Sequence, residues 1–356
     1  MVRRRSDDMH NALRSLAPGR PLREGIDRIL QGGKGALVVV GDGPEVLNIC
    51  SGGFLLDAAF SPHRLSELAK MDGAIVLAGD ISRIARANVH LVPNPNVPTS
   101  ETGTRHRTAE RVARSIDVPV IAVSERMSTI TLYVGDEKHQ LLPIARLLER
   151  ASQAMKTLER YRERMDEVSQ TLTVLEVDGL VAVRDVVTML QRTEMVLRIA
   201  EELESDMTEL GSEGRLFRMQ LDEVLTGVAR ERRFVVLDYL HDDNDWDVDK
   251  AMEGLARLDT ERLLDHGAVA SVLHLPDAGD LDARVHPRGF RMLSRIPRLP
   301  SSIIEAVVAR FGSLEAILDA SPADLEQVDG VGAHRAAAIR EGLDRLAERS
   351  LFDQVL

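Results

Sequence analysis

The middle of this chain places the strongest constraint on its fold. Residues 142–286 carry 18 basic and 31 acidic side chains, whereas residues 1–141 carry 18 and 16, and residues 287–356 carry 9 and 10. Between the charges of the middle segment, apolar residues recur every three or four positions, which is the period of an amphipathic helix. We therefore predict an all-α middle region that separates two end regions of different character.

Length and composition restrict the class of protein further. The chain has 356 residues, of which 44% are hydrophobic and 29% charged, as expected for a globular protein of two or three domains. Its single cysteine, Cys50, excludes an internal disulfide and a Cys-rich zinc site, and favours a reducing, cytoplasmic location. No apolar run approaches the ~20 residues that cross a bilayer, so we expect no membrane association.

Strand and helix patterns alternate in residues 1–141, which predicts a mixed α/β region. The predicted strands cover residues 36–40, 73–78, 118–123 and 129–134. The predicted helices cover residues 21–30, 62–70 and 105–116. Ser61 and Pro62 stand at the N-cap and first position of the second helix, where serine and proline are favoured.

Residues 100–114 are the most informative stretch of this region. Polar and glycine residues lead directly into an amphipathic helix, whose first turn holds Thr104, Arg105, His106, Arg107 and Thr108. A helix N-terminus presents unpaired N–H groups and a partial positive charge, so the two arginines and the histidine there are unfavourable for the helix dipole. Their presence fits a phosphate site, in which positive charge and directional hydrogen-bond donors act together. A solvated basic helix end that contacts acids elsewhere is the alternative.

Asp72 and Gly73 form a second candidate feature, just before a predicted buried strand. A single carboxylate beside phosphates is a usual way to hold Mg²⁺, because this ion keeps most of its water ligands. An Asp-Gly pair is also a common turn sequence. The pair by itself therefore fits an ordinary turn better than a metal site.

The C-terminal region contains two related units of about thirty residues, each with a short apolar lead, a Pro- or Gly-containing hairpin and a helix. In the second unit, Gly330 and Gly332 allow a tight turn that brings backbone N–H groups toward a phosphate, and Arg335 follows on the helix. Cations spaced three, four and three residues apart predict one basic stripe: Arg288, Arg291, Arg295 and Arg298. These features favour DNA binding, with a protein–protein module as the alternative.

Residues 241–249 alternate carboxylates in the manner of a calcium-binding loop. Counted from Asp243, Val248 replaces the glycine of such loops at the sixth position, and Gly254 replaces the glutamate at the twelfth. We therefore expect a solvated acidic loop rather than a metal site.

Together these features resemble the DNA-integrity-scanning diadenylate cyclase family along essentially the whole chain. The resemblance rests on two signatures, Asp72-Gly73-Ala74 and Arg105-His106-Arg107, with support from residues 52–54, 59–62, 100–103 and 124–126. It implies a multidomain fold. An N-terminal α/β diadenylate cyclase domain with a mixed sheet (1–141) precedes an all-α helical spine (142–286) and a C-terminal helix-hairpin-helix domain (287–356).

The resemblance also implies a reaction, in which two ATP molecules condense to cyclic di-3′,5′-AMP and two pyrophosphates with the help of Mg²⁺ or Mn²⁺. Each 3′-hydroxyl attacks the α-phosphate of the opposite ATP, so two sites must face each other, which the family achieves as a homo-octamer. The C-terminal domain is implied to bind branched or junction DNA, and the family links that binding to lower cyclase activity.

Roles for individual residues follow from the same resemblance. The implied catalytic residues are Asp72, Arg105, His106 and Arg107, with Asp72 also the metal ligand. The implied ATP contacts are Gly73, Ala74, Leu91, Thr104, Arg105, His106, Arg107, Thr108 and Ser124. The implied DNA contacts are Gly330, Gly332, Arg335, Arg295 and Arg298.

Two other functions fit the sequence. One is a non-catalytic, ATP-sensing protein that binds DNA junctions. The other is a nucleotidyltransferase that passes AMP to a different acceptor and needs no paired sites. The presence of both Asp72 and the Arg105-His106-Arg107 run favours catalysis over sensing.

Overall fold

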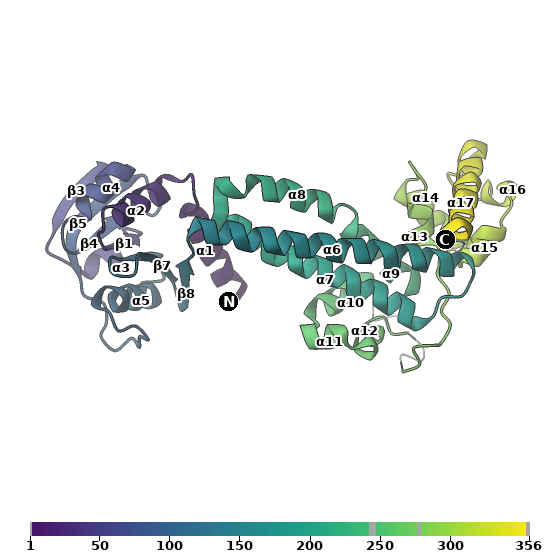
Figure 1. Ribbon diagram of the computed structural model, residues 1–356, viewed down its shortest axis with the longest axis horizontal. Coiled ribbons are helices and arrows are strands. Elements are labelled where there is room, and N and C mark those ends of the chain that lie inside the picture. Colours follow the sequence, from purple (N-terminus) through teal and green to yellow (C-terminus); the bar gives the residue numbers. More distant parts are fainter. Residues whose placement is uncertain (1, 242–246, 276–278, 354–356) are drawn as a thin grey trace. The chain divides into compact units, whose positions relative to one another are not determined.

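A computed structural model describes residues 2–241, 247–275 and 279–353 (Figure 1). The chain forms two compact units, Met1–Gln153 with Leu203–Met219, and Ala154–Glu202 with Gln220–Leu356. All three boundaries between the units fall inside helices: α6 (Ile144–Val177), α7 (Val183–Leu210) and α8 (Arg215–Leu225). Most of the acidic segment interpreted above as a solvated loop lies outside the described residues.

Eight strands of the first unit form one mixed sheet. Their order is β2-β5-β4-β1-β6-β7-β8, with β3 paired to β5, and β1 runs parallel to β4 while the other pairs are antiparallel. The strands are β1 (Ala36–Val40), β2 (Cys50–Ser51), β3 (Phe54–Ala59), β4 (Ala74–Leu77), β5 (Arg83–Leu91), β6 (Val120–Ser124), β7 (Thr129–Val134) and β8 (Glu137–Leu141).

Helices cover both faces of this sheet, and β1 shows why its sequence is wholly apolar. Val38 packs in one core cluster, with side chains from α2 and α4, whereas Leu37 and Val39 pack in a second cluster, with side chains from α5. A strand buried on both faces reads as a continuous hydrophobic run. The helices of the unit outside α6 and α7 are α1 (Val2–Ser15), α2 (Pro21–Gln31), α3 (Pro44–Asn48), α4 (Pro62–Leu68), α5 (Thr104–Ile116), the 3₁₀ helix η1 (Gly211–Gly214) and the start of α8 (Arg215–Leu225).

The predicted α/β elements are present, but four strands were not predicted: the two-residue β2, and β3, β5 and β8. Ser61 caps α4 as expected, its hydroxyl accepting the backbone N–H of Arg64 at 3.2 Å. The strands β3, β5 and β8 were not predicted because their sequences mix polar and apolar residues. In addition, the register of β5 shifts against both β3 and β4, which breaks the period of two that marks a strand.

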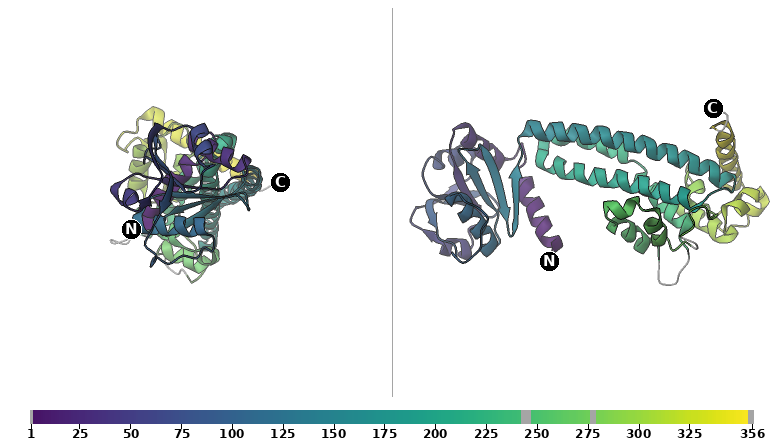
Figure 2. Two further views of the ribbon diagram at one scale, coloured as in Figure 1. Left: turned by 90° about the vertical axis from the view of Figure 1, so that its left-hand side faces the viewer. Right: turned by 60° about the horizontal axis from the view of Figure 1, so that its bottom comes forward.

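Helices make up the second unit (Figure 2). Besides the inner parts of α6 and α7, these are α9 (Val228–Tyr239), α10 (Val248–Arg257), α11 (Thr260–Leu264), α12 (His266–Val272), α13 (Phe290–Ser294), α14 (Ser301–Phe311), α15 (Leu314–Asp319), α16 (Pro322–Leu325) and α17 (Ala333–Asp353). Helices α13 to α17 share an apolar core of their own. Across the described ranges, no helix combines the length and the apolar character needed to span a bilayer.

Candidate functional site

The N-terminus of α5 carries the basic run and is held open for a ligand. Its N-cap is Gly103, so no side chain caps the first N–H groups. The buried Glu110 holds the loop that precedes α5. Its carboxylate accepts hydrogen bonds from the Thr99 hydroxyl at 2.5 Å and from the Ser100 N–H at 3.0 Å. The helix start is therefore rigidly placed while its donors stay available.

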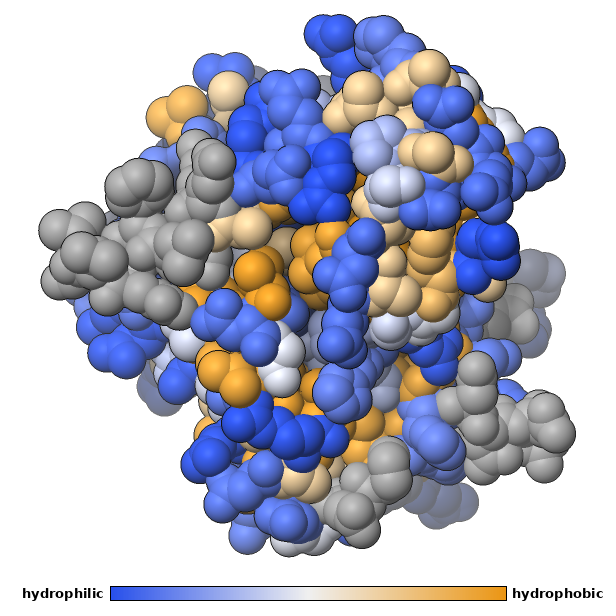
Figure 3. All heavy atoms as spheres, turned by 90° about the vertical axis from the view of Figure 1, so that its right-hand side faces the viewer, coloured by the Kyte–Doolittle hydropathy of each residue, from blue (hydrophilic) through white to orange (hydrophobic). Residues whose placement is uncertain are grey.

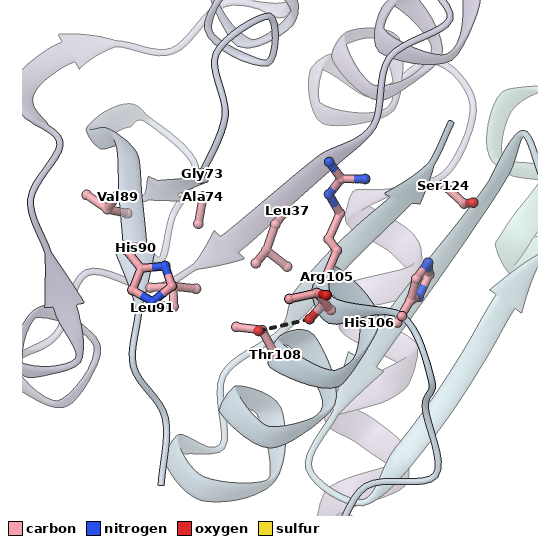
Figure 4. Close-up of a pocket in the computed structure, with 12 residues that line it drawn as sticks. Leu37, Gly73, Ala74, Val89, His90, Leu91, Arg105, His106, Thr108 and Ser124 are labelled. Carbon is pink, nitrogen blue, oxygen red and sulfur yellow. Dashed lines mark hydrogen bonds between the residues drawn. The ribbon is translucent and has the colours of Figure 1, made fainter. Parts of the chain in front are cut away.

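A hollow of about 450 Å³ lies at this helix end, between β1, β4, β5 and β6 (Figure 4). Its lining residues are Leu37, Gly73, Ala74, Val89, His90, Leu91, Gly103, Thr104, Arg105, His106, Thr108 and Ser124. The structure thus gathers in one place eight of the predicted nucleotide contacts, which come from segments up to fifty residues apart in the sequence. Leu37, Val89 and His90 were not predicted, because no local motif marks them, and Gly103 belongs to the supporting stretch 100–103 but was not predicted as a contact.

Asp72 and Arg107 do not line the hollow, although each adjoins a residue that does. Both side chains are exposed, and within the described part of the chain neither has a hydrogen-bond or ion-pair partner. The same ranges contain no group of three or more His, Cys, Asp or Glu side chains able to hold a metal ion. A metal held by Asp72 would therefore need water and ligand phosphates as its other ligands, which suits Mg²⁺.

Gly73 brings the backbone close to the neighbouring strand at the mouth of the hollow. Its φ is +101°, and a Cβ there would lie 2.9 Å from the carbonyl carbon of Asn88 and 3.0 Å from the carbonyl oxygen of Val89. These contacts are with backbone atoms, so a side chain cannot be accommodated by a rotamer change. The position of Asp72 is consequently set by the main chain.

The Arg105 side chain extends from α5 toward β1 and β6 (Figure 4). Its Nη1 lies 3.4 Å from the carbonyl oxygen of Val123, and a Cβ added to Gly35 would stand only 2.1 Å from that nitrogen. Gly35, directly before β1, therefore makes room for the guanidinium. No acid among the described residues pairs with Arg105, so its charge is available to an anion.

His106 differs from its two arginine neighbours, because its side chain takes part in a chain of hydrogen bonds. Its Nδ1 lies 2.9 Å from the Tyr133 hydroxyl, which donates to Glu101 at 2.8 Å, and Lys138 also donates to Glu101. Burial lowers the pKa of His106, an effect that the charge of Glu101 opposes. The lowered pKa favours the neutral imidazole over the third cation that the sequence suggested.

The C-terminal hairpin has the geometry expected of its glycines. Gly330 has a φ of +78°, and the guanidinium of Arg335 donates to its carbonyl at 2.6 Å while remaining exposed. Val331 between the glycines is buried, whereas Gly332 is exposed directly before α17. Figure 3 shows hydrophilic and hydrophobic residues mixed on the face that it draws. The residues at the start of α17, Ala333 and His334, are exposed.

The predicted basic stripe is wrong. Arg291 is fully buried, bonded to both carboxylate oxygens of Glu176 (the shorter contact 2.5 Å) and to Glu231 at 2.9 Å. Arg295 donates to the same Glu231 at 3.0 Å, whereas Arg298 lies exposed outside any helix with a φ of +62°. The stripe fails because α13 ends at Ser294, so the helical spacing of the four arginines does not continue.

Comparisons with known proteins agree with this arrangement. Residues 23–138 match the DisA bacterial checkpoint controller nucleotide-binding model, residues 141–281 its linker region, and residues 290–345 the SAM-like helix-hairpin-helix tandem. The DNA integrity scanning protein DisA of Frankia alni is 49% identical over 351 residues, which cover 98% of each chain. The chain belongs to the DisA family. The DisA of Kineococcus radiotolerans is also similar, 51% identical over 348 residues and 97% of each chain.

Membership of the DisA family confirms the predicted fold class: an N-terminal α/β domain with a mixed sheet, a helical linker and a C-terminal helix-hairpin-helix domain. The hollow at α5 lies inside the part that matches the DisA nucleotide-binding model. Among solved structures, DacA from Staphylococcus aureus is 20% identical over 40% of the chain with a TM-score of 0.28, too low to add to the description of the fold.

Proposed function

We propose that this protein is a diadenylate cyclase, which condenses two ATP molecules into cyclic di-3′,5′-AMP and two pyrophosphates, and that its C-terminal domain couples the reaction to branched DNA. The observation that carries the proposal is the single hollow into which Gly73, Leu91 and the α5 N-terminus converge. It combines an apolar wall for a base with uncapped N–H groups and an unpaired guanidinium for phosphates.

The chemistry requires positioning rather than a protein nucleophile. Ala74 and Leu91 would contact the adenine and ribose, and Thr104, Thr108 and Ser124 would bind phosphate oxygens. The Thr108 hydroxyl donates its proton to the Thr104 carbonyl at 3.0 Å (Figure 4), so it would have to rotate away from that carbonyl to donate to a phosphate oxygen. Arg105 and Arg107 would stabilise the charge that grows on the leaving pyrophosphate.

Asp72 is the residue that would hold Mg²⁺ or Mn²⁺ together with the nucleotide phosphates. Its carboxylate is exposed and unpaired among the described residues, as an ion that keeps several waters requires. The bound ion would draw electron density from the α-phosphate. Asp72 adjoins Gly73, which lines the hollow, and would also orient the hydroxyl of an ATP held by a second copy, so we propose apposed copies in an octamer.

Incubation of the full chain with ATP and Mg²⁺, followed by mass analysis, tests the proposal. Cyclic di-AMP with two pyrophosphates per molecule is the expected product. An adenylylated product of another mass would favour AMP transfer to a different acceptor. No product from an oligomer that binds ATP would favour the ATP-sensing alternative, which the name of the relatives, DNA integrity scanning protein, also fits.

The variant Asp72→Asn separates catalysis from binding. We expect it to lower product formation at least about 100-fold, because the metal-binding charge is lost, while ATP and DNA affinities change less than about threefold. The matched control is Asp80→Asn, an exposed carboxylate in the turn after β4 that does not line the hollow. Product formation that survives in Asp72→Asn would remove this residue from the mechanism.

DNA binding is tested by its salt dependence. We propose Gly330, Gly332, Arg335 and Arg298 as phosphate contacts, and leave Arg295 out because Glu231 already pairs with it. Affinity for a four-way junction should fall steeply with salt, and Arg335→Ala should reduce the slope of log K against log salt by about 1. Salt-independent affinity, or none, would make this domain an assembly module.

A further inference from the structure

The hydrogen-bond chain behind the hollow determines which nitrogen of His106 carries a proton. Tyr133 is buried, with 1% of its surface exposed, and its hydroxyl donates to Glu101 at 2.8 Å. A phenol has one proton to donate, so toward His106 the same oxygen can only accept. The 2.9 Å contact must then be an Nδ1–H of the imidazole donating to the Tyr133 oxygen.

The charges around the chain support the same placement of protons. Burial would raise the pKa of Glu101, but hydrogen bonds from Lys138 and Tyr133 hold it below its ordinary value, so this carboxylate is ionised. Burial and the bond to Glu101 raise the pKa of Tyr133 well above its usual range, so the phenol keeps its proton. Lys138 and Arg105 act with burial to lower the pKa of His106, against the attraction of Glu101.

The other ring nitrogen is free for a ligand. His106 lines the hollow, and no hydrogen bond links its Nε2 to any residue in the ranges that the structure describes. With Nδ1 occupied by the Tyr133 contact, Nε2 carries a lone pair whenever the imidazole is neutral.

We infer that Tyr133 and Glu101 are positioning residues that hold His106 as its Nδ1–H tautomer, so that Nε2 alone accepts a hydrogen bond from a ligand or exchanges a proton with it. The meaning of this for catalysis rests on the proposed cyclase function. Within the basic run, Arg105 and Arg107 then supply the fixed positive charge. His106 supplies an acceptor, suited to a hydroxyl or water proton at the nucleotide and able to become a donor only by protonation at Nε2.

The tautomer is measured directly by ¹⁵N NMR of the full chain labelled at histidine, with the His106 signals assigned by their loss in His106→Gln. We expect a protonated Nδ1 and an unprotonated Nε2 at neutral pH. In Tyr133→Phe the acceptor is gone, so the signals should shift toward the Nε2–H form. Tyr239→Phe is the matched control, because Tyr239 is also a buried phenol that donates to a glutamate, Glu176 at 2.9 Å, outside the hollow.

A second pair of variants keeps the test decisive if Tyr133→Phe fails to fold. Glu101→Gln retains an oxygen that accepts from Tyr133, so it should preserve the Nδ1–H tautomer, whereas Glu101→Ala should lose it. A native imidazole protonated at Nε2, or an unchanged tautomer in both Tyr133→Phe and Glu101→Ala, would overturn the inference.

Kinetics then connect the tautomer to the reaction. We expect kcat to fall at least about tenfold in Tyr133→Phe, with KM for ATP within about twofold and an altered pH profile, since a general acid–base contact is disturbed while phosphate contacts remain. Glu101→Gln should restore most of kcat relative to Glu101→Ala. If no variant or native protein makes product, the cyclase proposal fails, while the NMR result still decides the role of Tyr133.

Discussion

Two arginine-containing regions of the molecule show how the same side chain serves opposite purposes. Arg105 lies half-buried against Gly35, has no acidic partner among the described residues and lines a hollow. Arg291 is fully buried and bonds Glu176, Glu231 and the hydroxyl of Thr173. The first region leaves a positive charge without an acidic partner beside a hollow, whereas the second pairs a fully buried guanidinium with two carboxylates.

The difference teaches that partners, and not the number of cations, separate a binding site from a structural anchor. The acids that neutralise Arg291 come from α6 and α9, and Asp238 of α9 caps α13 by accepting the N–H groups of Gly289, Phe290 and Arg291 at 2.7–2.9 Å. A ligand phosphate would have to displace these bonds. At Arg105 no acid among the described residues would have to be displaced.

The largest effect should come from breaking the anchored region. Arg291→Ala leaves Glu176 buried and uncompensated, so we expect the second unit to lose about 3–5 kcal/mol of its free energy of unfolding. Denaturant unfolding followed by far-UV circular dichroism measures this loss. The control Arg298→Ala removes an exposed arginine and should cost less than about 0.5 kcal/mol. Equal losses in the two variants would contradict the comparison.

Removal of the unpaired arginine should affect activity instead of stability. Arg105→Ala is expected to lower kcat/KM for ATP about 100-fold, as loss of a preorganised donor to a developing charge commonly does. Its midpoint of thermal unfolding should stay within about 2 °C of the native value, because no ion pair is broken. Arg146→Ala, at an arginine with a side chain 75% exposed, is the activity control. A large loss of stability in Arg105→Ala would show that the guanidinium is structural.

The most gradual effect concerns pH and the cap of α13. Burial, followed by the charge of Glu176, raises the pKa of Asp238 to about 7, against the three N–H bonds that lower it. The folded protein therefore binds this proton more tightly than the unfolded chain does. The contribution of Asp238 to the free energy of unfolding is fully present below the pKa that this group has in the unfolded chain. It is lost as pH rises toward 7, at no more than about 1.4 kcal/mol per pH unit.

Comparison with Asp238→Asn isolates that contribution. The free energy of unfolding of the native protein, measured at intervals from pH 5 to pH 8, should fall relative to that of the variant up to about pH 7 and then run parallel to it. All other titrating groups are common to the two proteins and cancel. Parallel curves throughout the range would mean that Asp238 is ionised in both states.

Local sequence signals predicted the elements that build the nucleotide-binding region. Ser61-Pro62 marked the start of α4, and the polar run before Thr104 marked the start of α5. The features that were not predicted depend on contacts between residues that are distant in sequence. Arg291 looked like a surface cation because Glu176 lies 115 residues away, and Tyr133 looked like an ordinary strand residue because Glu101 lies 32 residues away. Periodicity cannot report such partners.

Gly35 gives the site an unusual vulnerability. The methyl group of an alanine at this position would overlap the place of the Arg105 guanidinium, with 2.1 Å between Cβ and Nη1. The guanidinium, at the end of a flexible side chain, would have to move from its place, although no residue that lines the hollow has been substituted. A search for altered mutants that considered only the lining residues would pass over this glycine.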